Sequence, residues 1–214
     1  MFGSVLVTPT LLDSFEFAAN APYDWKASSM KDFIGKIKRE KIDYPAWVGK
    51  GMDFEDTVYR VCKTSTAQEI KTQGSDNFRK VTAACYGGTF QNKLKKNLKI
   101  GEHKAFFFGY TDVDFINTTK DIKTCLKWKT KSKYLNKNQH KMYLWMNEKT
   151  HFEYIVAEWE NQTSDIVKSV HIIPYTNPGS DVLEKDIVER TKALFEFIHS
   201  KNLWEDYYYT FSKN

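Results

Sequence analysis

Two runs of strand-forming residues separated by a short polar turn constrain this sequence more than any other feature. Residues 104–116 are rich in Phe and Val, residues 117–120 read Asn-Thr-Thr-Lys, and residues 121–128 return with Ile, Cys and Leu. Because a turn this short joins strands that can pair with each other, the pattern predicts an antiparallel hairpin. The two predicted strands then lie side by side in one sheet.

The rest of the chain predicts further strands and several helices. Helical spacing of apolar residues indicates helices over residues 8–20, 29–41, 51–62, 134–147 and 181–201. We expect Tyr44-Pro45 to end the second of these helices. Strand patterns cover residues 81–86, 89–100, 152–159 and 166–175. This order predicts an α/β or α+β fold, with a central mixed sheet flanked by helices. We expect one domain over residues 1–214, with a helical N-terminal portion of about 80 residues packed on it.

Cysteine usage and hydropathy limit the class of protein. The three cysteines, Cys62, Cys85 and Cys125, form no Cys-x-x-Cys pair, which argues against zinc-ribbon and dithiol redox motifs. Widely spaced cysteines in odd number are typical of free thiols in a reducing compartment. No apolar run approaches the roughly 20 residues that span a membrane, and the first residues lack a basic leader. We therefore expect a cytoplasmic protein without a membrane partner, in the host cytoplasm if its source is a virus.

Two carboxylates and a lysine are expected to meet on the hairpin. Asp112 lies near the middle of the first strand, while Asp121 and Lys123 share one face of the second. Two neighbouring carboxylates repel unless a cation neutralises them, and Mg²⁺ or Mn²⁺ prefers such oxygen ligands. A lysine beside them can stabilise charge that builds on a phosphate. Asp114 is a rival ligand, and a surface ladder of ion pairs is the alternative interpretation.

A lysine-rich segment follows the hairpin. Eight lysines and a single acid, Asp121, occur between positions 120 and 141, whereas the net charge of the whole chain is only +5. Such a segment attracts polyanions, including a nucleic-acid backbone. The residues expected to hold that backbone are Lys127, Lys129, Lys131, Lys133 and Lys137. Trp128 and Tyr134 lie nearby and could stack on bases. The alternative is a solvated surface without a ligand.

The order of these motifs resembles the PD-(D/E)XK nuclease superfamily, and within it the RecB-like exonuclease group with its phage and CRISPR-associated relatives. The resemblance is carried, in order, by Thr8 to Phe15, Gly51-x-x-x-Glu55, Gly109-x-x-Asp112, Asp121-Ile-Lys123 and Gln139-x-x-x-Tyr143. The sequence departs from the family pattern at Thr111, where the family name has proline. Only eight residues separate Asp112 from Asp121, so the hairpin must be minimal.

The resemblance implies a restriction-endonuclease-like core and a Mg²⁺- or Mn²⁺-dependent deoxyribonuclease, above all an exonuclease of DNA processing or recombination. It implies that the metal ligands are Glu55, Asp112, Asp121 and the backbone carbonyl of Ile122. It also implies that Lys123 is the catalytic lysine, and that Gln139 and Tyr143 lie beside the site on one helix face. DNA is the implied partner. Because no Gly-x-x-x-x-Gly-Lys-Ser/Thr motif occurs, any motor or clamp would be another chain.

Two other hypotheses stay open. A non-catalytic nucleic-acid-binding module could retain the same fold, but the complete set of two acids and a lysine favours an enzyme. A small interaction protein with a coincidental motif is the third hypothesis. It would be favoured if residues 104–128 did not form a hairpin.

Overall fold

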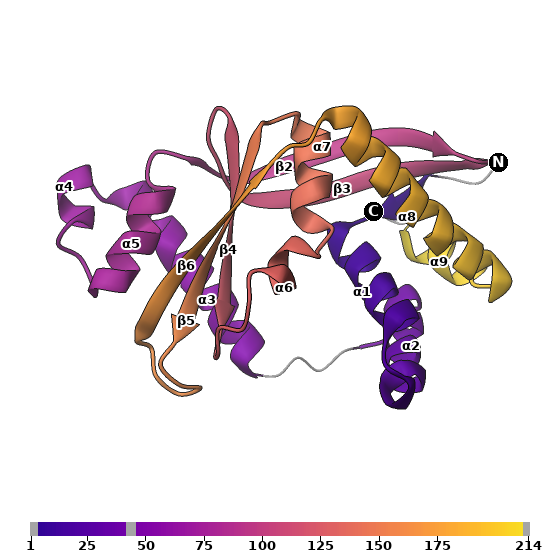
Figure 1. Ribbon diagram of the computed structural model, residues 1–214, viewed down its shortest axis with the longest axis horizontal. Helices are drawn as coiled ribbons and strands as arrows, with labels where there is room; N and C mark the ends of the chain where they lie inside the picture. The colour runs from indigo at the N-terminus through magenta and orange to yellow at the C-terminus, as the bar shows by residue number, and fades with distance from the viewer. Residues whose placement is uncertain (1–3, 42–45, 212–214) are drawn as a thin grey trace.

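The computed structural model describes residues 4–41 and 46–211, which form a mixed six-stranded sheet with helices on both faces (Figure 1). The strands are β1 (Val5–Val7), β2 (Thr89–Ile100), β3 (His103–Asp114), β4 (Thr118–Cys125), β5 (His151–Trp159) and β6 (Val167–Thr176). The helices are α1 (Pro9–Asn20), α2 (Tyr23–Ile37), α3 (Ala46–Thr64), α4 (Ala67–Ile70), α5 (Asp76–Cys85), α6 (Ser132–Leu135), α7 (Gln139–Asn147), α8 (Ser180–Ser200) and α9 (Trp204–Phe211). The predicted α/β architecture is therefore confirmed.

Strand β3 organises the sheet because it has three partner strands. One edge of β3 pairs with β2 in antiparallel register, from Thr89–Asp114 to Ile100–His103. The other edge is shared: β1 pairs in parallel with residues 105–107, and β4 pairs only at residues 113 and 114. Strand β4 then leaves β3 and runs parallel to β5, which pairs with β6 in antiparallel register. This divergence leaves a split between β3 and β4.

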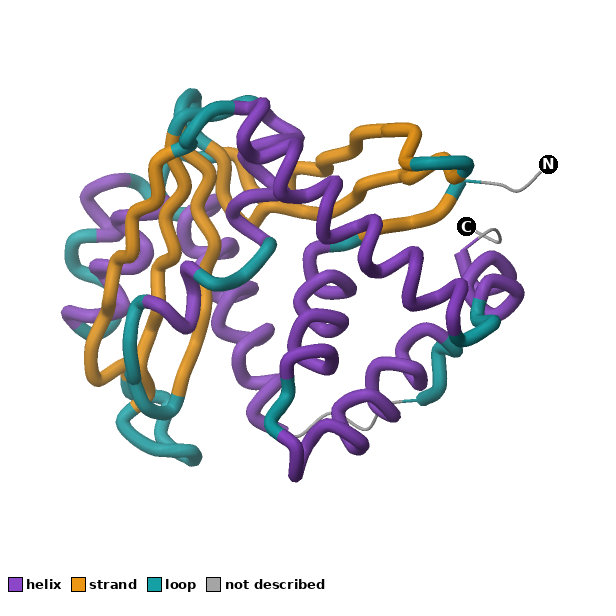
Figure 2. Tube along the Cα trace, turned by 45° about the vertical axis from the view of Figure 1, so that its right-hand side comes forward, coloured by secondary structure: helices purple, strands orange, loops and turns teal. Residues whose placement is uncertain are grey.

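Helices lie on both faces of the sheet (Figures 1 and 2), and the hydrophobic core forms one layer on each face. Helices α1, α2, α7, α8 and α9 cover one face, where the largest fully buried side chains include Phe33, Phe107, Trp145, Phe152 and Tyr207. Helices α3 and α5 cover the other face through Phe54, Val58, Val81 and Cys85. Burial of each large side chain contributes roughly 1.5–3 kcal/mol, so both layers hold the split strands in place.

The prediction of a strand over residues 81–86 is wrong, because these residues end helix α5. The Ser75 hydroxyl accepts a hydrogen bond from the Phe78 amide and so begins the helix. Val81, Thr82 and Cys85 then recur at helical spacing on the buried face. Their β-branched and apolar character imitates a strand, but the cap and the packing against α3 favour the helix.

Other boundaries also differ from the predictions. The second strand of the hairpin ends at Cys125, so Trp128 lies outside it. The helix predicted over residues 134–147 is two helices, α6 and α7, and helix α2 begins at Tyr23 instead of residue 29. Strand β1 and helix α9 were not predicted. The expected break at Tyr44-Pro45 falls outside the described residues. Within the described chain, no helix has the length and apolar character needed to cross a membrane.

Candidate active site

The split between β3 and β4 brings Asp112 against the second strand. Because the two strands pair only at residues 113–114 and 119–120, the Ile122 amide has no backbone partner on β3. The Asp112 carboxylate takes that place and accepts a 2.7 Å hydrogen bond from the Ile122 amide through Oδ2. Ile122 itself is held in register with Ile155 and is buried in the sheet layer beneath α3. This contact fixes Asp112 beside the residues that flank Ile122.

Asp121 is buried between a lysine and a glutamine. Its Oδ1 accepts a 2.6 Å hydrogen bond from Nε2 of Gln139, at the start of α7. Its Oδ2 lies 2.5 Å from Nζ of Lys123 but accepts no hydrogen bond of good geometry. The Lys123 ammonium also lies 3.5 Å from the carbonyl oxygen of Ile122. A carboxylate oxygen without a regular donor in a buried place is costly unless a cation compensates it.

Glu55 reaches the site from α3 because Gly51 lets that helix lie close to β4. A Cβ at Gly51 would stand 2.9 Å from Oγ1 of Thr124, a distance that side chains do not tolerate. Glu55 follows four residues later, on the same side of the helix. Burial, together with the nearby Asp112 carboxylate, raises the pKa of Glu55 to about 8. The steric argument therefore accounts for the glycine of the Gly-x-x-x-Glu motif.

The charges of the site are not balanced by the side chains alone. Burial raises the pKa of Asp121 to about 7, against the effect of Lys123 and with a further contribution from Asp112. Burial opposes the charge of Lys123, but the Asp121 and Asp112 carboxylates outweigh it and raise the pKa of the ammonium group. One lysine thus faces three acids, which is an environment that a divalent cation would neutralise.

The donor set fits a hard divalent cation in its chemistry, although no ready-made cage is present. In the part of the chain that the structure describes, no group of three His, Cys, Asp or Glu side chains already forms a metal-binding cluster. The available donors are carboxylate oxygens of Glu55, Asp112 and Asp121 and the carbonyl of Ile122, which are the ligands that Mg²⁺ and Mn²⁺ prefer.

Gly109 and Tyr143 join α7 to β3 next to these acids. A Cβ at Gly109 would lie 2.6 Å from Cε1 of Tyr143, so only glycine leaves room for the ring. Tyr143 is buried, and burial and the Asp121 charge raise the pKa of its hydroxyl, which therefore stays neutral. Gln139 lies one helical turn before Tyr143 on the same side of α7. The close ring contact thus sets the position from which Gln139 reaches Asp121.

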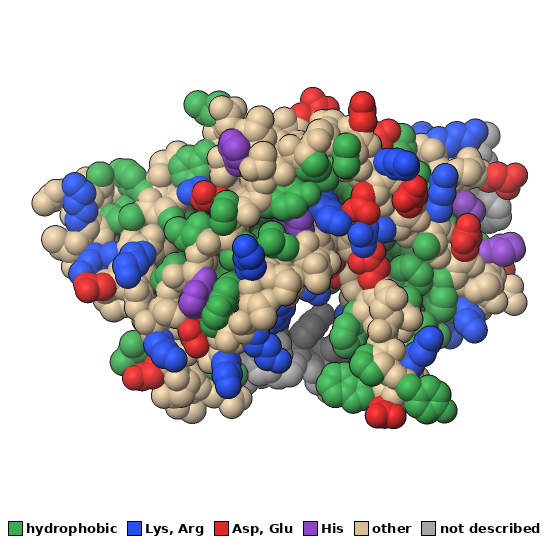
Figure 3. Space-filling view, viewed as in Figure 1, with side chains coloured by type: hydrophobic (Ala, Val, Ile, Leu, Met, Phe, Trp, Pro, Cys, Tyr) green, Lys and Arg blue, Asp and Glu red, His purple; other side chains and the backbone are tan. Residues whose placement is uncertain are grey.

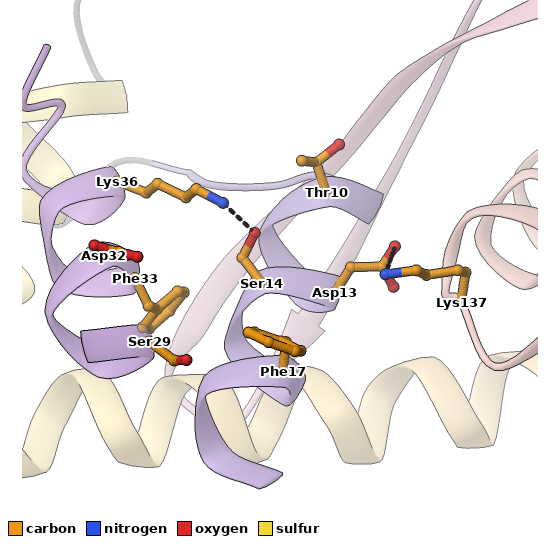
Figure 4. A pocket seen from close by; sticks show the side chains of 9 residues that line it. All are labelled: Thr10, Asp13, Ser14, Phe17, Ser29, Asp32, Phe33, Lys36 and Lys137. Carbon is orange, nitrogen blue, oxygen red and sulfur yellow. Dashed lines mark hydrogen bonds and ion pairs between the residues drawn. The ribbon is translucent and has the colours of Figure 1, made fainter. Parts of the chain in front are cut away.

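Asp13 supports α7 from helix α1 and was not predicted. Its Oδ1 accepts hydrogen bonds from the backbone amide and from Nδ2 of Asn138, at 2.7 and 3.0 Å. Burial raises the pKa of Asp13. Figure 4 shows Asp13 at the edge of a pocket of about 340 Å³ between α1 and α2, facing Lys137. The signal in the sequence that could have indicated this contact is the acidic residue Asp13 within the apolar pattern of residues 8–20.

The lysine-rich segment is exposed over most of its length. Lys127, Lys129, Lys131, Lys133 and Lys137 all lie at the surface, and Lys137 also lies 3.8 Å from Asp13. Three of them, Lys127, Lys129 and Lys133, line a cleft of about 280 Å³ together with Lys50, which sequence patterns did not indicate. Figure 3 shows several Lys and Arg side chains around the lower ends of β4, β5 and β6. Thr124 and Cys125, the two residues that follow Lys123 in β4, also line this cleft.

Some charged and aromatic residues near the site have other roles. Asp114 binds Lys149, Asn92 and Thr119 at 2.7–2.8 Å, and these contacts outweigh burial and lower its pKa. It is therefore no rival ligand. The Trp128 ring stacks on the His171 ring at 4.0 Å and on the Tyr134 ring at 5.8 Å. The faces that Trp128 and Tyr134 turn toward each other are therefore not open to a base.

Solved structures share this fold. The model matches the crystal structure of SSO0001 with a TM-score of 0.54 at 11% identity, covering 92% of this chain and 78% of that one. It matches the alkaline exonuclease LHK-Exo from Laribacter hongkongensis with a TM-score of 0.51 at 12% identity, covering 91% and 88% of the two chains. LHK-Exo in complex with dAMP matches with a TM-score of 0.52. No protein-family model and no curated protein matches the sequence.

The fold is thus the one found in an alkaline exonuclease, which agrees with the resemblance of the sequence to the PD-(D/E)XK exonuclease group. At this level of identity, the likeness concerns the backbone arrangement alone.

Proposed function

We propose that this protein is a metal-dependent deoxyribonuclease that hydrolyses phosphodiester bonds, most directly as an exonuclease in DNA processing or recombination. The observation that carries the proposal is the position of Asp121, buried between Lys123 and Gln139. Asp112 reaches the same place through the split strand, and Glu55 through the close packing of α3. The exonuclease fold of LHK-Exo supports the same reaction class.

The residues that would hold Mg²⁺ or Mn²⁺ are Glu55, Asp112 and Asp121, with the carbonyl of Ile122. When bound, such an ion supplies Lewis acidity and makes a water molecule more acidic. The raised pKa values of Glu55 and Asp121 mean that the site also takes up protons when it lacks a cation. Cation binding should therefore release protons near neutral pH.

Lys123 would act through its charge. Its pKa is raised by the Asp121 and Asp112 carboxylates, so the group stays protonated at neutral pH and is unsuited to act as a base. An ammonium group at this position stabilises the negative charge that develops on a phosphate during hydrolysis. Gln139 is a positioning residue, because it holds Asp121 and does not need to touch the substrate. Tyr143 fixes the helix that carries Gln139.

The lysines beside the site would hold the DNA backbone. The cleft lined by Lys50, Lys127, Lys129 and Lys133 also includes Thr124, one residue after Lys123 in β4, so these lysines lie at the end of the strand that carries Asp121. Phosphate contacts by lysine supply affinity without sequence preference, as a processing nuclease requires. We further propose a cytoplasmic protein, in the host if its source is a virus, with a separate chain as motor or clamp where one is needed.

A test uses end-labelled linear DNA and closed circular DNA of the same sequence, each with Mg²⁺, Mn²⁺ or chelator. The proposal predicts nucleotide release from the linear DNA with either metal, no release with chelator, and resistance of the circle. Cleavage of the linear DNA in chelator would contradict the metal dependence. Equal cleavage of the circle would replace the exonuclease by an endonuclease.

The second candidate is a non-catalytic DNA-binding module with the same fold. It is favoured by one observation, namely that the described acids do not form a ready metal-binding cluster. This candidate predicts that both DNAs bind and that neither is cleaved with any of the metals. The complete set of two acids and a lysine favours the enzyme instead.

A further inference from the structure

The outward face of the β2–β3 hairpin carries a row of aromatic rings. Phe106, Phe108 and Tyr110 alternate along β3, and neighbouring ring centroids lie 5.9 and 5.2 Å apart. Tyr110 is 46% exposed and the two phenylalanines are half-buried. A contiguous row of exposed aromatic rings on a protein surface often marks a site that binds a ligand or another molecule.

Lysines stand opposite these rings on β2. Lys93 pairs with Tyr110 and Lys95 with Phe108 in the antiparallel register, and both lysines are exposed. The Lys93 ammonium lies 5.2 Å from the centroid of the Phe108 ring. Strand β2 contains four lysines and no acid, and one of these, Lys99, continues the exposed row. The face is therefore aromatic and basic together.

The opposite face of the same hairpin is part of the core. Leu94 is buried and Leu98 packs against the same cluster. Lys96 turns to that side and donates a hydrogen bond to the backbone carbonyl of Trp145 on α7. Helices α7 and α8 contact β2 on this inner side, and Figures 1 and 2 show α8 running along the hairpin. The aromatic row thus lies on the side away from these helices.

We propose that this outward face, which we call the hairpin surface, binds a single-stranded segment of the DNA substrate next to the reacting phosphate. This inference rests on the proposed nuclease function. The three rings follow one another along the strand at 5.9 and 5.2 Å, so they form a continuous aromatic surface for successive bases of an extended single strand. Tyr110 lies two residues before Asp112 on β3, so the row ends next to the acids. The lysines supply the backbone contacts and the rings supply the stacking.

The charge of the face selects this occupant over a protein. A second copy of the chain, or an apolar partner, would have to bury Lys93, Lys95 and Lys99 without a compensating acid on β2. The phosphates of a single DNA strand neutralise those charges while the bases of the strand cover the rings. Single-stranded DNA therefore satisfies both parts of the surface at once.

The test compares an oligothymidylate with a base-free deoxyribose-phosphate strand of equal length, both measured by fluorescence anisotropy in chelator. The wild-type protein should bind the thymidylate more tightly. Tyr110→Ala should weaken thymidylate binding at least about fivefold and leave the base-free strand nearly unchanged, whereas Tyr110→Phe should retain the wild-type affinity. Tyr23→Ala, which removes an exposed ring on α2, is the matched control and should have no effect.

The lysines are tested separately. Replacing Lys93, Lys95 and Lys99 together by Gln should weaken both strands and lower the salt slope by about 2 units, at about 0.7 per lost contact. Sedimentation and thermal melting of each variant check assembly and folding. A folded Tyr110→Ala protein with unchanged affinity for both strands overturns the inference. So does a Tyr110→Ala protein that only changes its assembly state, because the face would then belong to a second copy.

The outcomes also separate this inference from the proposed function. If linear DNA is cleaved with metal but the hairpin variants bind as the wild type does, the nuclease stands and the hairpin surface is excluded. If the wild-type protein neither binds nor cleaves DNA, the nuclease proposal itself fails.

Discussion

The side-chain amide of Gln139 donates a 2.6 Å hydrogen bond to Oδ1 of the buried Asp121 and so ties the first residue of α7 to strand β4. The two residues are 18 positions apart in the chain. Because Lys123 lies 2.5 Å from the other carboxylate oxygen, the bond from Gln139 and the ion pair with Lys123 together orient the carboxylate. The helix thereby becomes part of the site without having to touch a substrate.

We predict that Gln139→Leu raises the Mg²⁺ concentration needed for cleavage and has a smaller effect on the stability of the folded protein. Loss of a hydrogen bond to a charged group costs about 1.5–3 kcal/mol, part of which falls on the folded protein and part on the orientation of Asp121. The Mg²⁺ concentration that gives half-maximal cleavage should therefore rise about tenfold, as for other residues that orient metal ligands. Gln139→Glu is the matched variant of equal size. A variant that melts earlier but keeps the wild-type Mg²⁺ dependence would show a merely structural role.

Gly109→Ala should destabilise the protein through Tyr143. The new methyl group would lie 2.6 Å from the ring, and such overpacking costs about 1–3 kcal/mol. Tyr143→Ala in the same chain removes the overlap, so the double variant should lose less stability than the sum of the two single variants. The free energy of unfolding in urea measures this coupling. Strict additivity would mean that the close contact has no energetic consequence.

His140 should make the protein less stable in acid. Its Nδ1 lies 3.0 Å from the Tyr154 hydroxyl, and burial lowers the pKa of the ring to about 3 from an ordinary 6.5. The folded protein thus binds fewer protons than the unfolded chain between these values. The stability contribution of the neutral ring is present above pH 6.5 and is lost as the pH falls toward 3, by up to about 1.4 kcal/mol per pH unit.

The raised pKa values of Glu55 and Asp121 act in the opposite direction, because they favour the folded protein at low pH. The effect of His140 is therefore isolated by the difference between the wild type and His140→Gln at each pH. This difference in unfolding free energy should shrink as the pH falls from 6.5 to 4. A difference that does not depend on pH would mean that the ring titrates normally.

The lysine-rich segment should determine the salt dependence of DNA binding. Replacing the exposed Lys129, Lys131 and Lys133 by Gln should lower the slope of log affinity against log salt by about 0.7–0.9 for each lost phosphate contact. Lys141 is the matched control, since it is paired with Asp186 at 2.9 Å and should not contribute. Binding is measured in Ca²⁺ to suppress cleavage. An unchanged slope would place the substrate path elsewhere.

The sequence predicted two strands joined by a short antiparallel turn because that feature depends on local patterns, although the structure limits their pairing to residues 113–114 and 119–120. Alternation along a strand places Asp121 and Lys123 on one face, and a short turn brings Asp112 near them. The sequence did not predict β1, because three residues form a strand only when β3 is available as a partner. Val81 to Cys85 was mistaken for a strand, since the Ser75 cap and the packing on α3 outweigh β-propensity there.

Contacts between residues far apart in the chain could not be predicted from local sequence patterns either. The limited pairing of β3 with β4 makes room for Asp112 at the Ile122 amide, but no local signal marks where two strands diverge. The hydrogen bond that the Asn138 amide donates to Asp13 joins residues 125 positions apart. The resemblance indicated that Glu55 and Gln139 belong near the site, and the close approach of Gly51 to Thr124 gives the steric reason for the glycine one helical turn before Glu55.

The most direct test of the central claim is the rate of nucleotide release from end-labelled linear DNA in Mg²⁺ by the wild type and by Asp121→Asn. The amide keeps the size of the side chain but removes the charge that would hold the cation. We expect release by the wild type, none by Asp121→Asn with a melting curve still cooperative, and wild-type release by the control Asp24→Asn, which changes an exposed acid on α2. Wild-type release by a folded Asp121→Asn protein at the same Mg²⁺ concentration would contradict the account.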